Sequence, residues 1–400
     1  MMKWASAISN ESDLATALEE CASHVSTELG QDSPASLVVV FASATYNDSA
    51  SDVPRIIRNH FPNAMILGCS GAGIIGAAKE IEQQSAVALT VGYLPGVEVK
   101  PFRVISDELP SPDEPPDAWV NILGVTPEEK PHFLVLMDPF SMAGESILSG
   151  LDYAFPSAVK VGGVASGSGL PGGHALFLDS QIYRDGAIGI ALTGNIVVET
   201  VVAQGCRPIG ELKRITMADR NLLMEIDGER PLDYLKDMFT RLSPDDQNLV
   251  RNNLFLGIAM DPQLELEQVN AGDFLIRNLI GTDQENGYVA VGEFLREGQL
   301  AQFHVRDAST SSEDLHRQLT RYMETTGQAS PVGALMFQCN GRGKHLYGRE
   351  NHDSDLFTEM IGSIPLGGFF CNGEIGPVGS STFLLAYTSS FGMFRPIHGA

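Results

Sequence analysis

The sequence predicts an α+β protein of two domains, with mixed, largely antiparallel sheets and helical crossovers. Three observations support this class. Short β-branched runs such as residues 37–41 alternate with amphipathic helical patterns. A unit of strand, helix, strand, glycine turn and strand recurs three times. Two-residue turn signals such as Gly194-Asn195 separate apolar runs, which is typical of antiparallel hairpins.

The first element is a helix. Apolar residues recur every three or four positions between Leu14 and Leu29. Ser12 can cap the start of this helix, and Gly30 can cap its end. The continuous apolar run at residues 37–41 then predicts a strand that is buried on both faces.

The repeated unit is marked by a proline that ends its helix and by a glycine eleven residues later. The marker pairs are Pro62 and Gly73, Pro156 and Gly167, and Pro365 and Gly376. An apolar strand follows each turn, at residues 86–91, 187–192 and 382–387. The prolines are 94 and then 209 residues apart, so a degenerate fourth copy is expected near residues 254–260.

Glycine at a repeated place indicates a positive φ or the close approach of a second segment or a ligand. The three turns either meet at a shared cleft or are separate tight corners. Turn residues at 226–231 mark the preferred domain boundary. The predicted segments are an N-terminal helix (1–34), a first domain (35–228), a second domain (229–388) and a C-terminal tail (389–400).

Acidic side chains dominate the charge of the chain. Among 400 residues, 26 are Lys or Arg and 50 are Asp or Glu, which gives a formal charge of −24. Such a body repels nucleic acid and anionic membranes. The longest apolar runs are too short to span a bilayer, and the N-terminus lacks the pattern of a secretory signal. Five cysteines without a CxxC pair fit reduced thiols. We therefore expect a soluble, cytoplasmic protein without nucleic-acid partners or membrane insertion.

Glycine-rich motifs follow one another along nearly the whole chain. In the first half they are Gly68-Cys69-Ser70-Gly71, Gly162-Gly163, residues 205–210 and residues 225–228. In the second half they are Ile276-Arg277-Asn278, residues 337–343 and residues 373–377. Together these motifs resemble the FIST family, over residues 35–388. The first domain is then similar to a FIST N-terminal domain and the second to a FIST C-terminal domain.

The resemblance implies a sensory protein of signal transduction, similar to stand-alone bacterial FIST proteins and to the FIST portion of an F-box protein. It implies a small polar ligand, such as an amino acid or a similar carboxylate, and a signalling protein as partner. Some relatives are described as haem-dependent. His132 and His174, which lie beside strands, are the candidate haem ligands, and otherwise we expect no cofactor.

The candidate ligand site combines the glycine turns with scarce cations. Arg207, Arg277 and Arg342 lie beside glycine or in apolar runs, where a guanidinium is costly to bury unpaired. Either they form internal ion pairs, with Glu374 or Asp227 as candidate partners, or they clamp a ligand carboxylate with help from backbone amides. The predicted ligand-binding residues are Cys69, Ser70, Gly71, Ser166, Arg207, Arg277, Asn278, Cys339, Arg342 and Glu374.

Two other functions stay open. One is a hydrolase that uses the Cys339 thiol, activated by Arg342, or the Glu374 carboxylate. Cys339 can equally be an inert buried thiol. The other is a protein-interaction platform without a ligand.

Two further motifs are not expected to form sites. The GxGxxG run at residues 71–76 is followed by only a short helical pattern at residues 77–84. It also lacks the acidic residue that a dinucleotide site requires. Cys339, His345 and His352 with Cys371 match no compact zinc spacing, so we expect no metal site.

Overall fold

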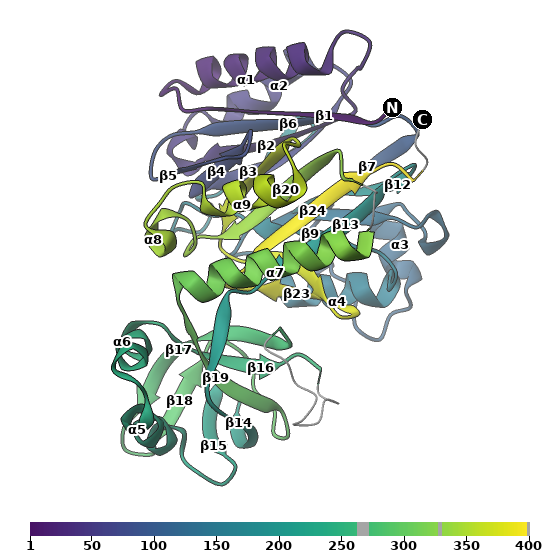
Figure 1. Ribbon diagram of the computed structural model, residues 1–400. Helices are drawn as coiled ribbons and strands as arrows, with labels where there is room; N and C mark the ends of the chain where they lie inside the picture. Colours follow the sequence, from purple (N-terminus) through teal and green to yellow (C-terminus); the bar gives the residue numbers. More distant parts are fainter. Residues whose placement is uncertain (262–271, 327–329, 398–400) are drawn as a thin grey trace. The chain divides into compact units, whose positions relative to one another are not determined.

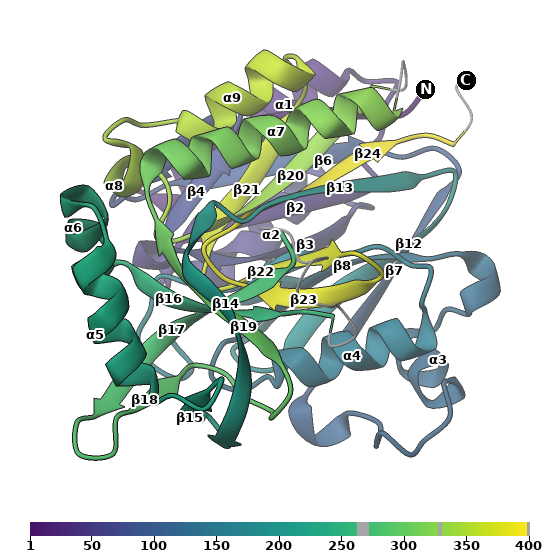
Figure 2. The ribbon, with the colours of Figure 1, turned by 60° about the horizontal axis from the view of Figure 1, so that its bottom comes forward.

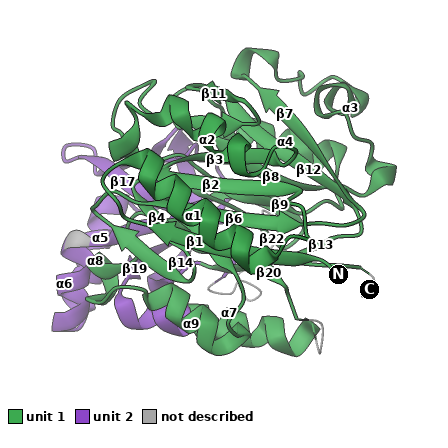
Figure 3. Ribbon diagram, turned by 90° about the horizontal axis from the view of Figure 1, so that it is seen from above, with its two compact units in different colours: residues 1–203, 315–384, 388–400 green, residues 204–314, 385–387 purple. Residues whose placement is uncertain are grey.

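The computed structural model describes residues 1–261, 272–326 and 330–397. The chain forms two compact units (Figure 3). The first unit holds three six-stranded sheets, and the second holds a closed six-stranded barrel. Parallel and antiparallel strand pairs occur together with helices, so the predicted α+β class is confirmed. The units contain residues 1–203, 315–384 and 388–400 for the first, and residues 204–314 and 385–387 for the second.

The first sheet joins strands from two distant parts of the chain. From edge to edge, its strands are β1 (Lys3–Ser9), β6 (Val87–Tyr93), β2 (Leu37–Ser43), β3 (Met65–Gly71), β10 (Leu176–Leu178) and β11 (Gln181–Tyr183). β2 and β3 are parallel, and the other neighbours are antiparallel. Helices α1 (Leu14–Leu29) and α2 (Val53–His60) cover one face of this sheet (Figure 1), where they pack against Val38 and Val40.

The second sheet repeats this arrangement. Its strands, in the same order, are β7 (Val97–Val104), β12 (Ala187–Gly194), β8 (His132–Met137), β9 (Lys160–Val164), β22 (Glu374–Val378) and β23 (Ser381–Leu385). β8 and β9 form its parallel pair. Helices α3 (Asp117–Leu123) and α4 (Gly144–Ala154) cover one face, where Trp119 and Leu148 belong to the same apolar cluster as Val135.

The third sheet follows the same order again. Its strands are β13 (Val197–Ala203), β24 (Ser389–Arg395), β20 (Gly333–Cys339), β21 (Leu366–Cys371), β4 (Gly73–Gly76) and β5 (Lys79–Glu82). β20 and β21 form the parallel pair. Helices α7 (Ala308–Thr326) and α9 (His352–Ile361) run over one face (Figure 2), where Leu319 and Phe357 pack in one cluster with Met336.

Short helices complete the first unit. They are α8 (Lys344–Tyr347) and the 3-10 helices η1 (Ala44–Tyr46), η2 (Ala50–Asp52), η3 (Ser106–Glu108) and η4 (Pro127–Glu129). Among the described helices, none is both long and apolar enough to cross a membrane.

The three sheets are three copies of one unit, and each copy lends a hairpin to another copy. β4 and β5 of the first copy join the third sheet, β10 and β11 of the second join the first sheet, and β22 and β23 of the third join the second. The inner faces of the three sheets share one apolar core that includes Phe41, Leu134 and Phe337. The repeat expected from the sequence is therefore present, and the exchange of hairpins links its copies.

The second unit is the barrel. Around the barrel, its strands are β14 (Cys206–Asp219), β15 (Leu222–Ile226), β18 (Tyr288–Val291), β17 (Phe274–Asp283), β16 (Leu254–Ala259) and β19 (Leu300–Arg306). Their pairing is antiparallel. The unit also contains α5 (Pro231–Arg241) and α6 (Pro244–Asn252), and Leu256 and Phe303 are in its core.

Backbone register corrects the alignment of the third copy. In each parallel pair, the strand that comes later in the chain (β3, β9 or β21) has one glycine that faces a backbone carbonyl oxygen of its partner strand. A Cβ added to this glycine would lie 1.8 or 1.9 Å from that oxygen. The residues that share this place are Gly68, Gly162 and Gly368. Pro365 precedes Gly368 by three residues fewer than the other two prolines precede Gly68 and Gly162. The glycine of the third corner, at the same distance after Gly368 as in the other copies, is therefore Gly373 and not Gly376.

The barrel explains the long interval before the third copy. It is inserted between β13 and α7, so residues 254–260 contribute the barrel strand β16 and no fourth copy. The strand that closes the third copy is β24, whose residues 389–395 were expected in a C-terminal tail. Residues 382–387 instead contribute to β23 of the exchanged hairpin. The expected domain boundary at residues 228 and 229 falls within the second unit and stays a prediction.

The structure confirms some of the predicted turns and helix ends and differs at others. α1 begins after Asp13, whose carboxylate accepts from Thr16 N at 2.9 Å, rather than after Ser12. The strand β1, which precedes α1, was not expected. The predicted hairpin at Gly194-Asn195 is wrong, because the strands on either side of it, β12 and β13, belong to different sheets. The Asn286-Gly287 turn does connect two paired strands, β17 and β18.

Candidate functional site

The three glycine corners meet at one place in the first unit. The ends of β3, β9 and β21 are joined there in a ring of hydrogen bonds. The links are Ser166 N to Ser70 O at 3.2 Å, Asn372 N to Val164 O at 3.1 Å, and Ala72 N to Phe370 O through the Ser166 hydroxyl. Because these three amides already donate to protein oxygens, they are not available to hold an anion.

Several predicted site residues belong to this corner junction or lie beside it. They are Cys69, Ser70, Gly71, Ser166 and Glu374, all of them buried. Ser70 Oγ accepts from Ala175 N at 3.1 Å, and Glu374 Oε2 accepts from the Thr388 hydroxyl at 2.8 Å. Burial raises the pKa of the Cys69 thiol well above its usual value, so it stays protonated. These contacts give the residues structural roles, and a ligand-binding role for them stays a prediction.

Three predicted site residues belong to the second unit. Arg207 is on β14, and Arg277 and Asn278 are on β17. Arg207 pairs with Asp246 and, at 3.1 Å, with Asp307. Arg277 Nε pairs with Glu293 at 2.9 Å, and Asn278 Oδ1 accepts from the Tyr387 hydroxyl. Ion pairing, one of the two roles expected for the arginines, is therefore observed for both, with other acidic partners than Asp227 and Glu374.

Arg342 is the centre of a buried polar network in the third sheet. Its side chain is fully buried, and Nε and Nη2 donate to the Asp353 carboxylate at 2.7 and 3.3 Å. Nη2 also donates to the Tyr347 hydroxyl at 2.6 Å. Burial is the largest single influence and opposes both charges, but the partner's charge and the hydrogen bonds around it together outweigh burial. The pKa of Asp353 is therefore held well below its usual range, and the pKa of Arg342 is raised. Further side chains that hydrogen-bond to Asp353 are Gln338, Ser389 and His352.

Glu80 reaches this network from β5, a strand of the first copy. The residue is only 4% exposed, and Oε1 accepts from both N and Oγ of Ser354 at 2.8 Å. Its second oxygen, Oε2, is buried without a hydrogen-bond partner. Burial, and then the charge of Asp353, raises the pKa of Glu80 to about 7. A carboxyl group that titrates near neutrality thus lies beside a buried ion pair.

Three residues of this network have apolar counterparts in the other copies. Strand register defines the counterparts, and those on β2, β6, β8 and β12 are buried. Gln338 corresponds to Ala42 and Met137, Ser389 corresponds to Val87 and Ala187, and Glu80 corresponds to Ile182. The backbone of this unit therefore accepts apolar residues at places where the third copy has Gln338, Ser389 and Glu80.

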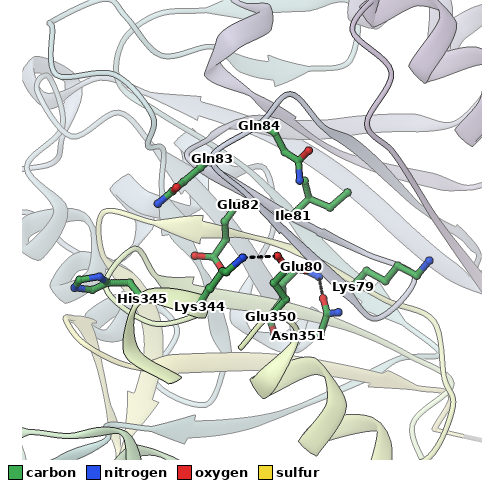
Figure 4. A pocket seen from close by; sticks show the side chains of 10 residues that line it. All are labelled: Lys79, Glu80, Ile81, Glu82, Gln83, Gln84, Lys344, His345, Glu350 and Asn351. Atoms are coloured by element: carbon green, nitrogen blue, oxygen red, sulfur yellow. Dashed lines mark hydrogen bonds and ion pairs between the residues drawn. The ribbon is translucent and has the colours of Figure 1, made fainter. Parts of the chain in front are cut away.

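A pocket of about 290 Å³ opens beside Glu80, between β5 and the segment around α8 (Figure 4). Glu80 and the half-buried Glu82 form its acidic, buried part. Lys79, Lys344 and His345 are exposed lining residues. Glu350 also lines the pocket, is exposed, and pairs with Lys344 at 2.8 Å. The pocket therefore has carboxylates at its buried end and both basic and acidic side chains at its exposed rim.

The candidate haem ligands have protein partners. His174 is fully buried, its Nδ1 lies 3.0 Å from Asp138 Oδ1, and its ring stacks on Phe140. His132 Nδ1 accepts from Val159 N at 3.4 Å, and burial lowers its pKa. Haem ligation by either residue stays an expectation of the family resemblance alone.

Sequence reasoning found two residues of this region, Arg342 and the half-buried Cys339, and missed Glu80 and Asp353. Residues 77–84 form a turn and the strand β5 instead of the expected short helix, so the GxGxxG run is not followed by the helix that a dinucleotide site uses. Glu80 also bonds to Ser354, 274 residues away, and no local pattern predicts such a partner. The sequence contained one indication of Glu80: it is an acidic residue close to the apolar run of the hairpin that follows the first glycine turn.

Sequence comparisons find relatives of this chain in bacteria and plants. An uncharacterized protein of Mycobacterium tuberculosis is 35% identical over 97% of this chain and 98% of its own length. Another, from Mycobacterium bovis, is 33% identical over 96% of both chains. An F-box/LRR-repeat protein of Arabidopsis thaliana is 24% identical over 73% of this chain and 61% of its own. A solved cyanuric acid hydrolase from A. caulinodans matches 99% of both chains at 7% identity, but its TM-score of 0.37 is too low to carry an argument.

Two family models match almost the whole chain. The FIST N domain model covers residues 36–229, and the FIST C domain model covers residues 231–377. The family that the glycine-rich motifs indicated is thereby confirmed, and the chain belongs to the FIST family.

Proposed function

We propose that this protein is a sensor that binds a small polar metabolite, of the size of an amino acid, in the pocket beside Glu80. FIST domains are generally thought to be small-ligand sensory domains. The observation that carries the proposal is the buried polar network of the third sheet, three residues of which have apolar counterparts in the other copies. Compared with the site expected from the sequence, the pocket beside Glu80 keeps Arg342 nearby but is not lined by the glycine corners.

The cost of the network supports a functional role. Taking an ion pair out of water costs several kcal/mol per charge before the partners compensate it. Well-packed apolar residues of similar volume are often as stable or more stable. The counterparts of Gln338 and Ser389 in both other copies, and that of Glu80 in the first sheet, are apolar, so the fold does not need polar side chains at these three places. Buried ionisable groups with shifted pKa values beside a pocket are typical of functional sites.

The pocket suits a small, polar ligand. Its volume of about 290 Å³ is at the lower end of the range for ligand pockets. It is lined by both acidic and basic side chains, which can satisfy a ligand with groups of both charges. A ligand here would also contact Glu80, which bonds to the first turn of α9 through Ser354. Binding would then bias the position of α9, and a partner protein could read that change.

A thermal-shift screen of the full chain tests the proposal. The screen contains amino acids, small amines and small carboxylates. A ligand that binds only the folded state raises the free energy of unfolding by about 2.7 kcal/mol at one hundred times its Kd, so the melting temperature rises.

The variant Lys344→Glu reverses a charge at the pocket rim and should change the response to the compounds that bind. The matched control is Lys236→Glu, which alters an exposed lysine of α5. A screen without any stabilising compound, or the same response in both variants and the wild type, would show that the pocket is not the ligand site.

A further inference from the structure

We propose that the pocket selects a protonated primary amine, which enters with its ammonium group first and binds the Glu80 carboxylate. This inference rests on the proposed function and adds the class of ligand and its orientation. It makes the amine, and not a carboxylate clamped by arginine, the group that is recognised at the buried end.

The hydrogen-bonding state of Glu80 provides the first argument. Oε1 accepts from Ser354, whereas Oε2 is buried without a hydrogen-bond partner, and Glu80 is one of the residues that line the pocket. A buried acceptor without a donor is costly. A primary ammonium brings three N–H donors and a positive charge, so it satisfies this oxygen and compensates its charge.

The distribution of charge with depth provides the second argument. Glu80 and Glu82 are at the buried end, and burial raises the pKa of Glu82 as well. An anion placed there would be repelled by both carboxylates, where Coulomb interactions are least screened. At the rim, the exposed Lys79 can meet an anionic group at the other end of the ligand. Lys344 and Glu350, which pair with each other at 2.8 Å, can meet a polar group there.

The structural role of Glu80 does not account for its charge. Its contact with Ser354 caps the start of α9 through a single oxygen. Glutamine would offer the same acceptor without a charge. In the hairpin of β10 and β11, the counterpart of Glu80 is Ile182, so the hairpin itself does not require a carboxylate. The charged second oxygen is therefore free to serve a ligand.

Matched pairs of compounds test this inference on the wild-type chain. Glycine, β-alanine and putrescine carry primary amines, whereas acetate, propionate and 1,4-butanediol are their counterparts without the amine. We expect melting temperature and calorimetric titration to show binding of compounds with an amine and much weaker binding of their counterparts.

The variant Glu80→Gln tests the residue. It keeps the acceptor for Ser354 but removes the charge, so we expect the affinity for the amines that bind to fall by at least about tenfold. The control Glu359→Gln makes the same change of charge on an exposed position of α9, outside the pocket, and should bind as the wild type does.

The outcomes separate the two proposals. If carboxylates without an amine bind as well as their amine counterparts, or if Glu80→Gln binds amines normally, the inference is wrong while the ligand pocket stands. If no compound binds, the proposed function fails too. The comparison of matched compounds uses the wild-type chain, so it decides the question even where Glu80→Gln does not fold.

Discussion

The first and third sheets have the same strand order and register but bury different chemistry at the ends of their central strands. In the first sheet, Ala42 and Val87 are paired in an apolar layer. In the third sheet, the same two places hold Gln338 and Ser389, both of which bond to Asp353. Since the backbone is shared, the difference lies in the side chains alone.

This comparison separates what the fold requires from what it tolerates. The three copies share a glycine at the parallel strand pair, because a side chain there would collide with a carbonyl oxygen. They do not share the ion pair of Arg342 and Asp353. Shared features are thus explained by backbone geometry, whereas the features of one copy require another explanation, for which we propose ligand binding.

The largest expected effect comes from breaking the ion pair. Arg342→Met leaves Asp353 buried without its compensating charge, which typically lowers the free energy of unfolding by about 3–5 kcal/mol. Urea denaturation measures this loss. Arg349→Met is the matched control, because Arg349 pairs with Asp355 at the surface and such pairs contribute less than about 1 kcal/mol. Equal losses in both variants would contradict the assignment of Arg342 as the centre of the network.

The shared glycines should respond alike in all three copies. Gly68→Ala, Gly162→Ala and Gly368→Ala each place a Cβ within 2 Å of a backbone oxygen that cannot move aside as a side chain would. We expect each to lose about 3 kcal/mol in chemical denaturation, at the upper end for overpacking. Gly169→Ala is the control, since no atom lies within 4 Å of its added Cβ. A single tolerant copy would show that the three units are less equivalent than their register indicates.

The titration of Glu80 should make stability depend on pH in the third sheet. Its pKa is raised from 4.5 to about 7 in the folded state, so the folded chain holds a proton that the unfolded chain has lost between these values. The contribution of Glu80 to stability is therefore present at low pH and is lost as pH rises through this window.

Glu80→Gln removes this titration. We expect the variant to gain about 2 kcal/mol relative to the wild type between roughly pH 5 and pH 8. Urea denaturation at both pH values measures the change, and the other titrating groups cancel in the comparison. A constant difference between the two proteins would contradict the raised pKa.

The smallest expected effect comes from making the third copy resemble the second. Gln338→Met introduces the residue found at the equivalent place on β8, and its volume is similar. It removes one hydrogen bond to Asp353 but also removes Oε1, which is buried without a partner. We expect the free energy of unfolding to change by less than about 1 kcal/mol. A loss as large as that of Arg342→Met would mean that the network acts as one structural unit.

Much of the local structure was predictable because it depends on neighbours in the sequence. The apolar spacing from Leu14 to Leu29 predicted α1, and the run at residues 37–41 predicted β2. The proline and glycine spacing revealed the repeat. The proline spacing predicts the wrong register for the third copy, because Pro365 lies closer to its glycine corner than the other prolines do.

By itself, the sequence determined the family, the α+β class and the presence of three similar units, since these depend on local spacing and apolar patterns. Tertiary structure alone decided where the hairpins go, and therefore which side chains meet. Glu80 reaches Ser354 and the neighbourhood of Asp353 because β5 pairs through β4 with a strand of another copy. A strand's hydrogen-bonding edge is generic backbone and does not specify its partner, so the exchange, and the pocket that it builds, follow from the packing of the whole unit.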